Sequence, residues 1–66
     1  MKNTIKIERA RLNITQEQLA GHIGVSRQSI NAIESGRYIP STVLALKLSR
    51  FFNKPVEEIF SLENDD

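Results

Sequence analysis

Three polar side chains, Arg27, Gln28 and Asn31, have the types and the spacing to form paired hydrogen bonds from one face of a helix. Ile30 and Ile33 recur at helical spacing, so a short helix is expected here. At about 100° of turn per residue, Gln28 points directly away from these isoleucines, with Arg27 and Asn31 beside it. A Gln amide can form two hydrogen bonds with an adenine, and an Arg guanidinium can do so with a guanine. The face therefore suits the reading of base edges; the alternative is a solvated polar face.

Five residues suit contacts with phosphate groups. They lie near the start of this helix, near the start of the helix before it, or just past the end of this helix. A helix N-terminus presents free backbone N–H groups and a positive dipole to an anion, and flanking polar side chains add hydrogen bonds. The residues placed in this way are Gln16, Ser26, Ser29, Arg37 and Tyr38. For Tyr38 the alternative is a ring packed against the next helix, with its hydroxyl in water.

No set of residues suits catalysis or metal binding. The chain has no cysteine, and its single histidine, His22, has no second ligand at metal-binding spacing. It lacks a glycine-rich phosphate loop, and 66 residues leave little room for a substrate cleft. We therefore expect no enzyme, no catalytic residue, no metal, no cofactor and no small-molecule substrate. His22 is expected on the surface.

Charge is divided unevenly along the chain. Residues 1–54 contain all nine Lys and Arg and only three acids, a net charge of +6, whereas residues 55–66 contain five acids and no base, a net charge of −5. A basic body suits a polyanion such as duplex DNA, and an acidic tail is tolerable only on a side remote from phosphates. The alternative is ordinary surface charge, because +6 is modest for a nucleic-acid-binding protein.

Five helices joined by short turns are expected, which makes an all-α fold. Apolar residues recur at spacings of three and four, and glycine or proline interrupts the pattern between segments. Asn3 or Thr4 is placed to cap the first helix, and Ser41 the fourth. The helices are expected over about 5–13, 16–23, 27–35, 42–52 and 56–62, although residues 60–62 can instead form a short extended tail. The first helix is expected to carry Ile5, Ile7 and Leu12, and the fourth to supply Leu44, Leu48 and Phe52 to the core.

The second and third helices have the spacing of a helix-turn-helix over residues 16–35. Thr15 followed by Gln18 is a capping-box start, Gly24 ends the second helix, and Ser26 caps the third. The small side chain of Ala20 lets the two helices touch, and apolar residues fill their crossing: Leu19, Ile23, Val25, Ile30 and Ile33. In such a unit the second helix enters the major groove of DNA with its first residues at base edges.

The segment from Ile5 to Phe60 resembles the phage repressor and Cro-type family, also called the Xre-like helix-turn-helix regulators. The resemblance rests on Arg9 and, in order, on the stretches TQEQLA (15–20), GVSRQSI (24–30), IESG (33–36), PS (40–41) and VEEIF (56–60). It is strongest with the short stand-alone members. The resemblance implies a lambda-repressor-like fold of five helices, binding of double-stranded DNA, and an internal ion pair between Arg9 and Glu34. Lys54-Pro55 departs from the family pattern before the last helix.

A two-fold symmetric homodimer is expected. One reading helix contacts few bases, whereas two such helices about 34 Å apart match a palindromic operator. The chain also has more apolar side chains than a small domain can enclose. Those near its end are expected to form the interface: Val56, Ile59, Phe60 and Leu62. The alternative is that Phe60 and Leu62 fold back over the protein's own core.

The sequence thus predicts one domain over residues 1–66, family-like over 5–60 and with an acidic tail over 61–66. The expected function is a DNA-binding transcriptional regulator that acts in the cytoplasm as a repressor. No segment is apolar enough to span a membrane. An antitoxin-like protein or a protein-interaction module with the same fold is the alternative. The polar reading face favours DNA, because a protein-binding face would carry aromatic or aliphatic anchors.

Overall fold

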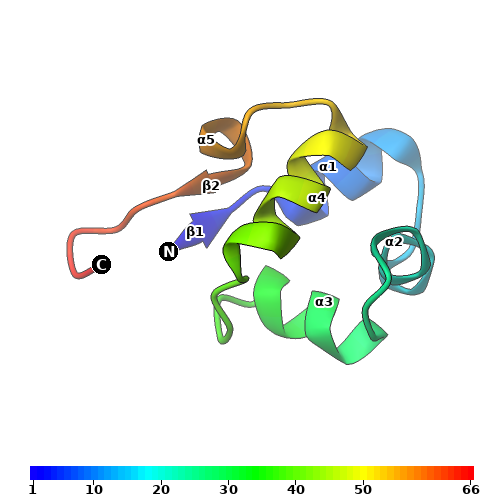
Figure 1. Cartoon of the computed structure of the whole chain (residues 1–66), viewed down its shortest axis with the longest axis horizontal. Coiled ribbons are helices and arrows are strands. Elements are labelled where there is room, and N and C mark those ends of the chain that lie inside the picture. Colours follow the sequence, from blue (N-terminus) through cyan, green and yellow to red (C-terminus); the bar gives the residue numbers. More distant parts are fainter.

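The computed structural model describes residues 1–66 as five helices and two short strands (Figure 1). In chain order they are β1 (Lys2–Asn3), α1 (Ile5–Leu12), α2 (Gln16–Ile23), α3 (Arg27–Glu34), α4 (Thr42–Phe52), α5 (Val56–Ile59) and β2 (Phe60–Ser61). The all-α architecture predicted from the sequence is confirmed. None of the helices combines the length and the apolarity that a membrane crossing requires.

Local side-chain caps set the starts of α2, α3 and α4, as predicted. Thr15 Oγ1 accepts a hydrogen bond from the backbone N–H of Gln18 at 3.0 Å, and the Gln18 side chain accepts one from the Thr15 N–H at 2.9 Å. Ser26 and Ser41 cap α3 and α4 in the same way, each through one backbone N–H. Gly24 ends α2 with a φ of 86°, a left-handed conformation that glycine adopts without steric cost.

Of the apolar residues that α1 carries, Ile5 is the one that is fully buried. Ile7 and Leu12 are half exposed, whereas Ile5 and Glu8 are buried. Residues three apart share a helix face, so the inward face that begins at Ile5 continues through Glu8.

The buried carboxylate of Glu8 is compensated by two basic side chains. Lys54 Nζ lies 3.1 Å from its Oε2 atom, and Arg11 Nη1 lies 3.4 Å from the same atom. A buried charge without such partners is strongly unfavourable. Lys54, which departs from the family pattern, thus joins the turn after α4 to α1.

The ends of the chain pair as a two-stranded antiparallel sheet, with Lys2 opposite Ser61 and Asn3 opposite Phe60. Phe60 has extended backbone angles, φ −118° and ψ 139°, which allow it to pair with β1. The last helix therefore ends at Ile59. The prediction that it continues to residue 62 was wrong, and the alternative of a short extended tail holds for Phe60 and Ser61. The two termini consequently lie on the same side of the molecule (Figure 1).

A single cluster of eleven buried apolar residues forms the core, and every helix contributes to it. Its members are Ile5, Leu19, Ala20, Ile23, Ile30, Ile33, Leu44, Leu48, Phe52, Ile59 and Phe60. Ile59 is 1% exposed and Phe60 is 7% exposed, so both of these residues, expected at a dimer interface, pack in the protein's own core. Pairing with Asn3 in the sheet holds Phe60 there. Leu62, in contrast, is 79% exposed, and Val56 is half-buried.

Candidate nucleic-acid interface

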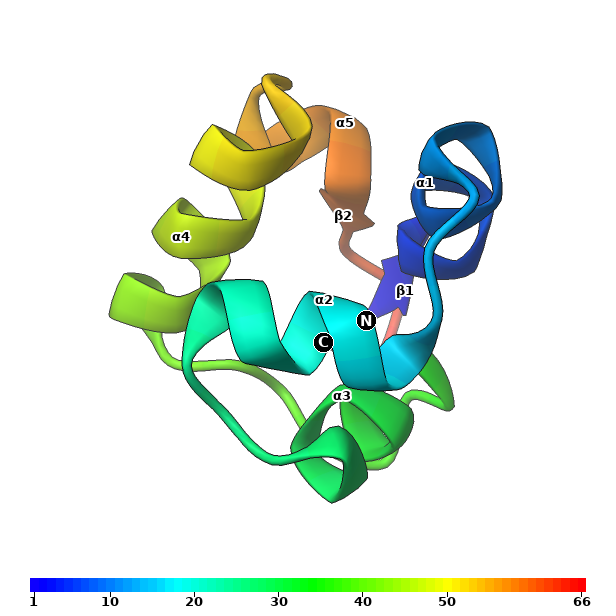
Figure 2. The same cartoon turned by 90° about the vertical axis from the view of Figure 1, so that its right-hand side faces the viewer.

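The helix-turn-helix is formed by α2 and α3, and α3 lies at one end of the molecule, beneath α2 in Figure 2. Ile30 and Ile33 anchor α3 in the core with almost no exposed surface. The opposite face of α3 is polar. α3 begins after the short turn that follows Gly24, and no other helix or strand covers its N-terminus in either view (Figure 1 and Figure 2). A face of this kind is free to approach a large partner.

The three residues expected to read bases lie together on this polar face. Arg27, Gln28 and Asn31 are all exposed. Together with Ala32 and Arg37 they line one shallow hollow of about 450 Å³. Four of its five lining residues have polar side chains that can form hydrogen bonds with a partner.

The residues expected to contact phosphates surround α3. They differ in their exposure and in the hydrogen bonds that they already form. Ser26 Oγ accepts the capping bond from the Ser29 N–H at 3.1 Å, and the two hydroxyl oxygens are 3.0 Å apart. One of the two hydroxyls therefore keeps a proton for an outside acceptor. Gln16, the first residue of α2, is half-buried, and Tyr38 is exposed beyond the end of α3.

Arg9 and Glu34 form a bidentate ion pair between α1 and α3. Arg9 Nε donates to Glu34 Oε2 at 2.6 Å, and Arg9 Nη2 donates to Glu34 Oε1 at 3.1 Å. The third nitrogen, Nη1, donates to the backbone carbonyl of Ile14 at 3.0 Å. The hydrogen-bonded carboxylate raises the pKa of the Arg9 guanidinium above its ordinary value.

A chain of hydrogen bonds continues from this ion pair to the exposed face of α3, and the sequence did not predict it. Gln16 Nε2 donates to Glu34 Oε1 at 3.3 Å, and Asn31 Nδ2 donates to Gln16 Oε1 at 3.4 Å. Arg37 Nη2 in turn donates to Asn31 Oδ1 at 2.9 Å. The partners are six to eighteen residues apart, and no local pattern signals such contacts.

The acidic tail lies at the sheet, where the chain begins and ends. The amino group of Met1 lies 3.1 Å from a carboxylate oxygen of Glu63 and 3.0 Å from one of Asp66. These contacts hold the tail beside β1, and α5, which leads into it, lies at the opposite end of the molecule from α3 (Figure 1 and Figure 2). His22 is exposed on α2, where its ring packs against Phe51 with the ring centres 4.9 Å apart.

Comparisons with known proteins agree with this geometry. Residues 5–59 match the protein family described as Helix-turn-helix. Over the full length of both chains, the protein is 53% identical to an uncharacterized HTH-type transcriptional regulator of Methanocaldococcus jannaschii and 46% identical to YgzD, another of Bacillus subtilis. It is also 41% identical, over 77% of its length, to the HTH-type transcriptional activator BcrR of Enterococcus faecalis, of which it matches 25%. The chain therefore belongs to the Xre/Cro-like helix-turn-helix family of DNA-binding transcriptional regulators, which are not enzymes.

Proposed function

We propose that the protein is a sequence-specific repressor that binds a palindromic operator as a homodimer, with α3 in the major groove. The observation that carries the proposal is the exposed polar face of α3, where Arg27, Gln28 and Asn31 border one hollow. Such a regulator acts where the DNA lies, in the cytoplasm. The chain acts as one unit, because its core is a single cluster.

Base recognition is assigned to the first turns of α3. Gln28 is suited to an adenine, which offers a ring nitrogen and an amino group to one amide. Arg27, one residue earlier, is suited to a guanine. Asn31 follows one turn later, on the same exposed side of α3.

Phosphate contacts are assigned to polar groups around the reading helix. The hydroxyls of Ser26 and Ser29 stand at the N-terminus of α3, where the helix dipole favours an anion. The Gln16 amide has one N–H left after its bond to Glu34, and the exposed hydroxyl of Tyr38 lies beyond α3. These contacts fix the position of α3 without reading sequence.

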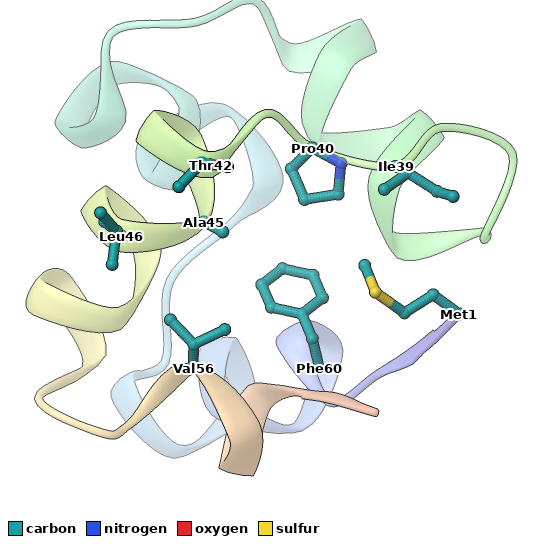
Figure 3. A pocket seen from close by; sticks show the side chains of 8 residues that line it. All are labelled: Met1, Ile39, Pro40, Thr42, Ala45, Leu46, Val56 and Phe60. Atoms are coloured by element: carbon teal, nitrogen blue, oxygen red, sulfur yellow. The ribbon is translucent and has the colours of Figure 1, made fainter. Parts of the chain in front are cut away.

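The dimer is assigned to an apolar groove that the structure leaves open. The groove has a volume of about 290 Å³ and is lined by Met1, Ile39, Pro40, Thr42, Ala45, Leu46, Val56 and Phe60 (Figure 3). Ile39 and Leu46 at its lining are more than half exposed. Val56 was expected at the interface from sequence; Leu62, also expected there, is exposed directly after β2.

A second copy of the chain is the occupant that suits this groove. Basic Lys47 and Arg50 lie beside Leu46 on α4, while α5 and the tail carry only acidic charges. In a two-fold dimer the basic side of one copy can face the acidic side of the other, which adds charge complementarity to the apolar contact. Two reading helices then face one palindrome.

Selection of binding sites from random duplex DNA tests the proposal. We expect a palindrome whose half-sites lie about one helical turn, roughly 34 Å, apart. A promoter that carries this palindrome should drive less reporter expression when the protein is present, because bound protein occludes it. Recovery of no preferred sequence would contradict the proposal, and increased expression would show an activator instead of a repressor.

A further inference from the structure

Arg37 lies beyond the C-terminal end of α3, but its side chain folds back along the exposed face of that helix. Its Nη2 atom donates to Asn31 Oδ1 at 2.9 Å, and its Nε atom donates to Ser35 Oγ at 2.9 Å. The sequence predicts a phosphate contact for this residue, as for any basic group flanking a reading helix. The two bonds instead hold its guanidinium on α3 itself.

The position of Arg37 is that of a residue on the reading surface. Its side chain lines the same shallow hollow as Arg27 and Gln28, the two residues assigned to base recognition. A side chain that only flanked the helix would not share this hollow. Arg37 thereby adds a third long polar side chain to a face that otherwise has two.

The two bonds leave a specific edge of the guanidinium free. They use the single N–H of Nε and one of the two N–H groups of Nη2. The edge formed by Nη1 and Nη2 keeps two parallel N–H donors. Two parallel donors match the O6 and N7 acceptors that a guanine presents in the major groove.

We propose that Arg37 reads a guanine in the major groove and that Asn31 and Ser35 are positioning residues that orient its guanidinium. The inference rests on the proposed docking of α3 in that groove, and it gives Asn31 an indirect part in recognition. Gln16 supports Asn31 in the same way, because it joins the Asn31 amide to the ion pair of Glu34 and Arg9. A guanidinium held before binding loses less side-chain entropy when it meets its base.

The variant Arg37→Lys separates base reading from phosphate contact, because lysine keeps the charge but has no bidentate edge. The measurement is the affinity for the selected operator and for every single-base-pair change in it, at fixed salt. We expect Arg37→Lys to lose about ten-fold to hundred-fold of discrimination at one G·C pair in each half-site, with the other preferences unchanged. Arg11→Lys, the same change at an exposed site on α1, is the matched control.

Asn31→Ala tests the positioning role. It should weaken the preference at the same base pair as Arg37→Lys, and the double variant should lose no more there than Arg37→Lys alone. Loss of preference at a different base pair would make Asn31 a direct reader and overturn its assignment. Unchanged preferences in Arg37→Lys would overturn the guanine assignment and leave Arg37 as a phosphate contact. A parent protein without any base preference would instead refute the proposed function itself.

Discussion

Glu34 holds the guanidinium of Arg9 through two hydrogen bonds, and its Oε1 atom also accepts a bond from Gln16. One carboxylate thus joins α1, the start of α2 and the end of α3. The Glu34 side chain is 8% exposed and that of Arg9 is 15% exposed. Loss of the carboxylate would leave a largely buried arginine without its counter-charge.

Glu34→Ala is therefore expected to destabilise the protein by about 3 kcal/mol, near the low end for a broken buried ion pair. The low end applies because Arg9 keeps its bond to the carbonyl of Ile14. Thermal unfolding without DNA measures the loss, and Glu34→Gln, which keeps a hydrogen-bond acceptor, should lose less. A Glu34→Ala protein that unfolds like the parent but no longer binds DNA would show that the pair serves binding and not stability.

The ion cluster around Glu8 gives a second stability prediction. Lys54→Ala leaves the buried carboxylate with Arg11 alone, whose side chain is largely exposed and lies 3.4 Å away. We expect a loss of about 1–3 kcal/mol, the cost of leaving a buried polar group poorly paired. Urea unfolding provides the measurement. Lys6→Ala is the control, because Lys6 is exposed on α1 and forms no ion pair; equal unfolding midpoints for the two variants would refute the role of Lys54.

Alanine substitution at Gly21, inside α2, and at Gly24, directly after α2, should change the stability of the protein in opposite directions. Gly21 lies inside the helix with open space where a Cβ would stand, so Gly21→Ala should stabilise the protein by up to about 1 kcal/mol through helix propensity. Gly24 has a φ of +86°, so Gly24→Ala should destabilise it by about 1–2 kcal/mol. Comparison of the two melting temperatures with that of the parent is the test. If Gly24→Ala melted at or above the parent's temperature, the left-handed turn between α2 and α3 would be in error.

The starts of α2 and α4 and the end of α2 were predictable from the sequence because their causes are local. Thr15 and Ser41 each accept a bond from a backbone N–H three residues away, and Gly24 needs no partner at all. The contacts that escaped prediction join residues far apart. Lys54 meets Glu8 across 46 positions, and Asn3 meets Phe60 through the sheet, so neither the buried acid nor the burial of Phe60 has a signature in any short window.

Of the candidate site, the exposure of Arg27 and Gln28 follows from helical periodicity alone. The bonds of Asn31 do not, because the side chain of Arg37 reaches it from beyond the helix end. Periodicity gives the side of a helix on which a residue lies. It does not show which residue on that side a long side chain will contact.

Dimer formation through the apolar groove predicts that Leu46→Asp yields a monomer. A charge at this exposed position would be buried without a partner in the dimer, while the fold of the free chain should tolerate it. Sedimentation of the parent and the variant at micromolar concentrations measures the change. Ile7→Asp places the same charge on an exposed isoleucine of α1, outside the groove, and should leave the dimer intact. A parent that sediments as a monomer would contradict the dimer, and a dimeric Leu46→Asp would contradict this interface.

Phosphate contacts should differ from base contacts in what their loss affects. Tyr38→Phe removes only the hydroxyl that is proposed to contact a phosphate. It should therefore weaken binding to the operator and to a scrambled duplex equally, by about 0.5–1.5 kcal/mol. Affinities at a single salt concentration give the comparison. A loss confined to the operator, or no loss on either duplex, would remove Tyr38 from the phosphate set.

The central claim, that α3 reads sequence from its exposed polar face, is tested most directly by Gln28→Ala. The measurement is the dissociation constant for the selected operator and for a scrambled duplex of the same length at the same salt. We expect the variant, like Arg27→Ala, to lose about 1–3 kcal/mol on the operator and almost nothing on the scrambled duplex. Equal losses on the two duplexes, or none on either, would contradict the claim.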